Sequence, residues 1–126
     1  MKIKSILSVL VIAGTLLLSA CGGGNKELKQ DAANIGDAMC RSIETMNKLK
    51  AADPGDSALV RKLQKESHNV QTEMTILYDE FKKKYGEKVK SEKFNKEFAR
   101  YLRESMLNCK ALSKEDRAAF EKQLAE

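Results

Sequence analysis

Three cysteines and one histidine are the residues of this 126-residue chain whose side chains can take part in the widest range of reactions. His68 follows Ser67 directly, and neighbouring side chains on a helix point about 100° apart, so the two cannot act together as base and nucleophile. The carboxylates alternate with Lys or Arg at helical spacings, as on a solvated helix face. Glu-x-x-His, HExxH, GxSxG and phosphate-binding glycine motifs do not occur. The sequence therefore predicts a protein that is not an enzyme and needs no metal or cofactor.

The N-terminus has the organisation of an export signal. Residues 1–4 contain two lysines, and residues 6–18 form a continuous apolar stretch. At 1.5 Å per helical residue this stretch reaches about 20 Å, well short of the roughly 30 Å hydrocarbon core of a bilayer. A cleaved signal peptide over residues 1–20 is therefore predicted, rather than a permanent membrane span.

The sequence Leu-Ser-Ala-Cys at residues 18–21 resembles the lipobox of bacterial lipoproteins, in which a branched apolar residue and two small residues precede a cysteine. The resemblance covers only the first 21 residues. It implies a cut before Cys21 and acyl chains, palmitate among them, on the new N-terminal residue. In Gram-negative lipoproteins an Asp after the lipidated cysteine favours the inner membrane. Gly22 stands there instead, which implies an anchor in the outer membrane facing the periplasm.

Residues 21–25 place three glycines and an asparagine after the cysteine, so we expect a flexible tether of about 10–12 Å between the anchor and a domain over residues 26–126. Without the signal peptide the chain has 21 basic and 18 acidic residues, a balance of +3. This charge is small and evenly spread along the sequence, so no nucleic acid is expected as a partner. The expected partners are the lipid bilayer, through Cys21, and another envelope or exported protein.

From residue 26 onward, apolar residues recur at alternating intervals of three and four, the pattern of amphipathic helices. The first segment has a heptad register at Leu28, Ala32, Ile35, Met39, Ser42, Met46 and Leu49. The chain's only proline, Pro54, ends that segment. Asp53, Asp56 and Ser57 then offer side-chain oxygens to cap the next helix.

Two further segments and a short fourth one continue the helical pattern. The second carries apolar residues from Val60 to Tyr85 and ends at Gly86; the third begins near Ser91, and Ser113 opens the fourth. The sequence predicts an all-α fold, a small up-down bundle of three helices of about 20–30 residues plus a short C-terminal helix. In an alternative arrangement, the first two helices form a long hairpin that mediates a homodimer.

Cys40 and Cys109 remain once Cys21 carries lipid, and two cysteines with one histidine are too few for a closed zinc site. The exported compartment permits disulfides. In an up-down-up bundle the first and third helices run parallel, and the two cysteines lie about 21 Å and 27 Å along them. A structural disulfide that stabilises the fold by about 4 kcal/mol is predicted.

The densest aromatic group comes from the third and fourth predicted helices, with Phe94, Phe98, Tyr101 and Phe120 as members. Tyr78 and Tyr85 extend it along the second helix. We expect most of these rings to fill one end of the core. Aromatic side chains are also enriched at binding hot spots. Any exposed part of the group is therefore a candidate partner patch, with Tyr78, Tyr85, Phe94, Phe98 and Tyr101 as its residues.

The leading functional hypothesis is a membrane-anchored, non-enzymatic protein that binds another protein or has a structural role in the envelope. A protective role, such as immunity to a toxin or exclusion of a mobile element, belongs to the same class. The alternative is a carrier of haem or another apolar ligand inside the bundle. Met39, Met46, Met74 and Met106 would line that interior, with His68 as a candidate haem ligand.

Overall fold

A computed structural model describes residues 24–126 of the chain. The predicted signal peptide and Cys21 lie outside the described residues. The described segment contains four α-helices, one 3₁₀-helix and no strand, which confirms the all-α prediction. The elements are α2 (Gly24–Ala51), α3 (Ser57–Tyr85), η2 (Gly86–Lys90), α4 (Glu92–Met106) and α5 (Lys114–Ala125).

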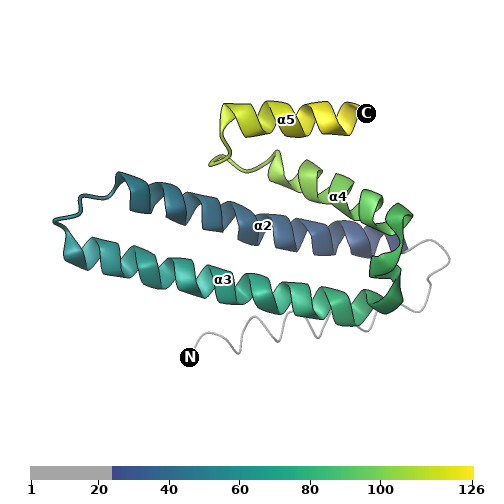
Figure 1. Ribbon diagram of the computed structural model, residues 1–126, viewed down its shortest axis with the longest axis horizontal. Coiled ribbons are helices and arrows are strands. Elements are labelled where there is room, and N and C mark those ends of the chain that lie inside the picture. The colour runs from purple at the N-terminus through teal and green to yellow at the C-terminus, as the bar shows by residue number, and fades with distance from the viewer. Residues whose placement is uncertain (1–23) are drawn as a thin grey trace.

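The helices follow one another in the order α3, α2, α4, α5 across the molecule (Figure 1). α2 and α3 form a long antiparallel hairpin, α4 runs parallel to α2 on its other side, and α5 folds back along α4. No Cα atom of α3 comes within 8 Å of one in α4 or α5. The predicted up-down order is confirmed. However, α4 has 15 residues rather than the 20–30 expected, so the long hairpin extends beyond it.

Helix boundaries are set by local capping, as the sequence indicated. The side chains of Asp56, Ser91 and Ser113 each accept a hydrogen bond from the backbone amide three residues further on. These bonds satisfy N–H groups that have no partner inside the helix. Gly86 alone among the described residues has a positive φ, 49°, and ends α3 where a β-carbon would be strained.

The core consists of two clusters, one on each side of the middle of the molecule. The first lies where α2, α3 and α4 meet, and its buried members are Leu28, Ala32, Ile35, Phe81 and Tyr101. The second surrounds the disulfide, with Met106, Cys109 and Leu112 buried. Phe120 packs in this second cluster rather than with the aromatic group predicted from the sequence, because α5 turns back beside the disulfide.

α2 buries more of its surface than the heptad register predicts. Gly36, Ala38 and Thr45 lie outside that register and are buried all the same. They are covered because α2 packs against α3 on one side and α4 on another. Met46 belongs to the register but is 49% exposed. It lies in the last part of α2, which continues past the end of α4.

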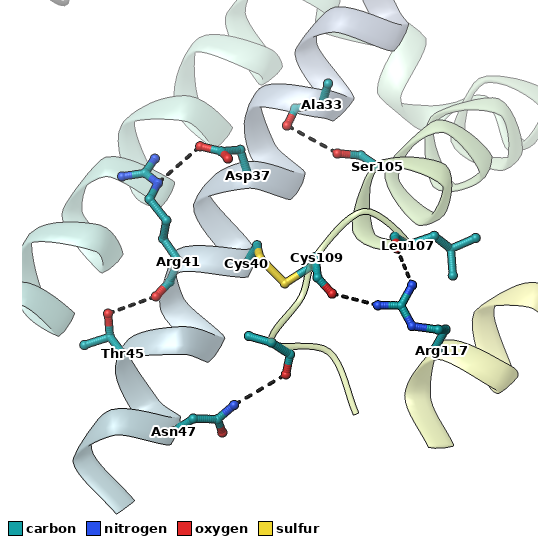
Figure 2. Close-up of a disulfide and its surroundings, with 11 residues drawn as sticks. Ala33, Asp37, Cys40, Arg41, Thr45, Asn47, Ser105, Leu107, Cys109 and Arg117 are labelled. Carbon is teal, nitrogen blue, oxygen red and sulfur yellow. Dashed lines mark hydrogen bonds and ion pairs between the residues drawn. A yellow bond between two sulfur atoms is a disulfide. The ribbon is translucent and has the colours of Figure 1, made fainter. Parts of the chain in front are cut away.

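The predicted disulfide joins Cys40, in the middle of α2, to Cys109, with 5.6 Å between the two Cα atoms (Figure 2). Cys109 lies in the loop after α4, whereas the sequence pattern predicted that it lies within the helix. Arg117 of α5 explains the early helix end. Its guanidinium donates to the carbonyl of Leu107 and, at 2.9 Å, to that of Cys109. These bonds satisfy carbonyl groups that a continuing helix would otherwise have paired.

We expect reduction of the disulfide to lower the free energy of unfolding by up to about 4 kcal/mol, because it releases a long closed loop in the unfolded chain. Urea denaturation with and without reductant measures this difference. The Cys40→Ser/Cys109→Ser variant should match the reduced protein and ignore the reductant. An unchanged denaturation midpoint on reduction would contradict the expected contribution.

Gly36 marks the closest approach of α2 to α4. A β-carbon at this position would lie 2.5 Å from Oγ of Ser105 and 2.9 Å from its Cβ. The Ser105 hydroxyl also donates to the carbonyl of Ala33 at 3.4 Å, so a side chain of α4 is bonded to the backbone of α2 here (Figure 2). The absence of a side chain at Gly36 therefore allows the two helices to pack.

We expect Gly36→Ala to destabilise the protein by about 1–3 kcal/mol, because steric overlap outweighs the roughly 1 kcal/mol gain in helix propensity. Thermal or urea denaturation measures the change. A second substitution, Ser105→Gly, removes both overlapping atoms and should restore much of the loss in a double-mutant cycle. A Gly36→Ala variant more stable than the parent would show that the helices separate at no cost.

Candidate functional site

Four of the five aromatic residues singled out from the sequence come together around Phe81. The ring centroid of Phe81 lies 4.5 Å from that of Phe98 and 4.7 Å from that of Tyr85, and Phe94 lies 5.0 Å from Tyr85. Tyr101 is buried in the same cluster. These rings pack α4 against the end of α3, although the two backbones stay apart. They serve as core and offer a partner little free surface.

The hydroxyl of Tyr85 is also committed to the fold. It donates to Oδ2 of Asp31 at 2.7 Å, and Nζ of Lys84 lies 2.7 Å from the same oxygen. Burial raises the pKa of Tyr85 above its ordinary value, and the hydrogen bond to Asp31 raises it further. Tyr85 therefore stays neutral and links the end of α3 to the beginning of α2.

Tyr78 also packs against this core cluster, and in addition it lines an open depression on the flank of α3. The depression has a volume of about 440 Å³, and its lining residues are Gln71, Met74, Thr75, Tyr78, Asp79 and Lys82. Met74 and Tyr78 are half-buried, so an apolar floor is bordered by polar and charged groups. Tyr and Met side chains of this kind are enriched at protein–protein interfaces.

The large apolar side chains that the described structure leaves exposed all belong to the α2–α3 hairpin. Met46 is 49% exposed, Leu59 40% and Ile76 53%. Ile76 and Tyr78 are two residues apart on one helix, so their side chains point about 200° apart, to opposite sides of α3. The exposed apolar groups are therefore scattered, and the depression at Tyr78 is the better candidate for a binding surface.

An ion pair joins the two helices of the hairpin near its middle. The guanidinium of Arg41 makes two hydrogen bonds to the carboxylate of Glu73, at 2.8 Å and 2.6 Å, and a third to Asp37 at 3.2 Å. The hydrogen bond from Arg41 lowers the pKa of Glu73, and the same contact raises the pKa of Arg41. Each side chain already has its partner, so this group fixes the register of α3 on α2.

Charge is unevenly distributed over the fold, which corrects the even spread inferred from the sequence. Residues 82–96 contain seven lysines and two glutamates, a balance of +5. The remainder of residues 24–126 has 14 basic and 16 acidic residues, a balance of −2. Residues 82–96 cover the end of α3, all of η2 and the beginning of α4, so the largest excess of positive charge lies at that end of the molecule (Figure 1). The hairpin tip at the other end has a smaller excess, +3 in residues 48–65.

The methionines proposed to line a ligand cavity do not share one interior space. Met106 is buried beside the disulfide, Met74 lines the open depression, and Met46 is exposed. His68 is exposed on α3. No group of three or more His, Cys, Asp or Glu side chains in the described residues could hold a metal ion. This placement gives no support to a haem or apolar-ligand carrier.

No protein-family model, curated protein or solved structure shows significant similarity to this chain. None of the helices in the described part of the chain combines the length and apolar character that crossing a bilayer requires.

We expect Glu73→Gln to lower the free energy of unfolding at pH 7 by about 0.5–1 kcal/mol, a small value because both partners are about 40% exposed. The pKa of Glu73 is lowered in the folded state, so the pair stabilises the fold above the ordinary carboxyl value of 4.5. That contribution disappears as the pH falls through the lower folded value. The difference between variant and parent should therefore shrink as the pH is lowered from 7 to well below 4.5.

Urea denaturation at both ends of this pH range measures the effect. Glu66→Gln is the matched control, because Glu66 lies on the same helix, is exposed and forms no ion pair with any described residue. An equal loss of stability in the two variants would show that the Arg41 contact contributes nothing specific.

Proposed function

We propose that this chain is a lipid-anchored envelope protein that binds another envelope or exported protein and catalyses no reaction. The observation that carries the proposal is the uncovered flank of α3. α4 packs on α2 without its backbone approaching α3, and the depression with Met74 and Tyr78 lies open on the flank of α3. An apolar floor with a polar border is the usual composition of a protein-binding surface.

The anchor supports the same proposal. Residues 18–21 resemble a lipobox, and two or three acyl chains on Cys21 would hold the protein stably on a membrane. Confinement to that surface raises the effective concentration of the domain towards partners in the same membrane. The Cys40–Cys109 disulfide fits an oxidising compartment, and the outer membrane facing the periplasm is the proposed location. Structural and protective roles both fit this mode of action.

We expect a photo-reactive amino acid at position 78 to cross-link one discrete envelope protein in living cells. The same group at position 76 is the matched control, because it is exposed on the opposite side of α3. Tyr78→Ala should weaken binding of that protein by about 30-fold, since a central Tyr contributes about 2 kcal/mol at a hot spot. Ile76→Ala should leave it unchanged.

Tyr78 also packs against the core, so Tyr78→Ala should lower the unfolding temperature by several degrees, whereas Ile76→Ala should leave it nearly unchanged. Binding is therefore measured well below both unfolding temperatures, which separates a lost contact from a damaged fold. Cross-links of equal strength from the two positions would contradict the proposed surface. So would a Tyr78→Ala variant that binds the cross-linked protein as tightly as the parent.

A further inference from the structure

The positive end of the molecule offers lysines that the fold itself does not use. Three of the seven lysines in residues 82–96 form ion pairs: Lys84 with Asp31, Lys90 with Glu87 and Lys96 with Glu92. The other four, which are Lys82, Lys83, Lys88 and Lys93, are exposed and form no ion pair with any described residue. Their ammonium groups are free to meet an external negative charge.

This end of the molecule is also where the polypeptide leads towards Cys21. α2 begins at Gly24, beside the corner formed by the end of α3, η2 and the beginning of α4 (Figure 1). The contacts of Asp31 with Lys84 and Tyr85 hold the two together. Two residues lie between Cys21 and Gly24, so the cysteine lies at most about 11 Å from the start of α2.

We propose that residues 82–96 are a docking surface for anionic phospholipid headgroups of the membrane. Each lysine close to such a surface raises affinity by about fivefold, and the attraction fades beyond about 8 Å at physiological salt. Because residues 82–96 lie close to the proposed anchor at Cys21, their lysines would be near enough to the bilayer for this attraction to act. The position next to the bilayer rests on the proposed lipid at Cys21, whereas the attraction to anionic lipid does not.

The composition of the basic end favours a bilayer over other anionic partners. All seven basic residues are lysines and none is arginine. Lysine acts as a hydrated point charge, which suits laterally mobile headgroups, whereas arginine provides the fixed two-pronged geometry used to recognise nucleic acids and carboxylates. Tyr85 and Phe94, the two aromatic residues within this range, both pack against the core cluster.

Docking at this end would orient the whole domain. The tip of the α2–α3 hairpin is also basic, with a balance of +3 in residues 48–65, so charge alone does not select one end of the molecule. The short reach from Cys21 to α2 brings residues 82–96 to the bilayer and leaves the hairpin tip at the far end. Tyr78 lies seven residues before the end of α3, which places it about 10 Å further along the helix axis. The candidate partner surface therefore borders the lipid surface at Lys82 and extends from there along α3, away from the bilayer.

Amine labelling of the full-length protein on vesicles tests the proposal. The protein is purified from the envelope of its expression host and mixed with vesicles of phosphatidylcholine alone or with about 30 mol% phosphatidylglycerol. We expect phosphatidylglycerol to reduce labelling of the four unpaired lysines at least threefold. Labelling of four lysines near the hairpin tip, Lys48, Lys50, Lys62 and Lys65, should not change. Salt at about 0.5 M should abolish the protection.

Two variants of equal net charge provide the matched comparison. Replacing Lys82, Lys83, Lys88 and Lys93 by Gln should remove the protection that phosphatidylglycerol gives Lys84, Lys90 and Lys96. Replacing Lys48, Lys50, Lys62 and Lys65 by Gln should preserve it. All eight residues are exposed, so both variants are expected to fold. Equal protection on the two kinds of vesicle, or equal loss in the two variants, would overturn the proposal.

The intact mass of the same sample reports acylation at Cys21 separately. An unacylated chain whose lysines are still protected by phosphatidylglycerol would overturn the proposed anchor and support the basic surface. An acylated chain whose lysines are labelled equally on both kinds of vesicle would overturn the basic surface and leave the anchor in place.

Discussion

The structure depends on the burial of α2 between two other helices. α3 and α4 each pack on α2 and not backbone to backbone on each other, so α2 supplies the common surface of the fold. Its small residues make this possible. Gly36 lets α4 approach closely, and Ala32 and Ala38 are completely buried. The Cys40–Cys109 disulfide then links the loop after α4 to the middle of α2.

The same arrangement explains where the molecule can interact with others. Because α4 is short and does not cover α3, the flank of α3 around Tyr78 stays open. Tyr78 packs against the core on one side and lines this depression with Met74 on the other. The aromatic rings near the other end of α3 do reach α4, so the open flank stops there. The core residues and the candidate binding surface are therefore two parts of one face of α3. How far α4 extends determines which part of that face is covered.

Electrostatics divides the molecule in a second way. The net charge of residues 24–126 is +3, which is the sum of +5 in residues 82–96 and −2 in the remainder. The turn through η2 concentrates lysines from two helices at one corner, and Asp31 connects that corner to the start of α2. The proposed protein contact around Tyr78 and the proposed lipid contact follow one another along α3 and meet at Lys82, which belongs to both. A single rigid helix sets the spacing between them.

Sequence alone determined the helical class, the cysteine pair and the helix boundaries at Asp56, Gly86 and Ser113. These features depend on residue type and on interactions within a few positions of the chain. Tertiary structure alone decided that Thr45 is buried, that Cys109 follows its helix rather than lying in it, and which aromatic side chain remains open. These features depend on which helices pack together although they are far apart in the sequence. An apolar periodicity marks the face of a helix that is buried, but it does not show how long the helix packed against that face is.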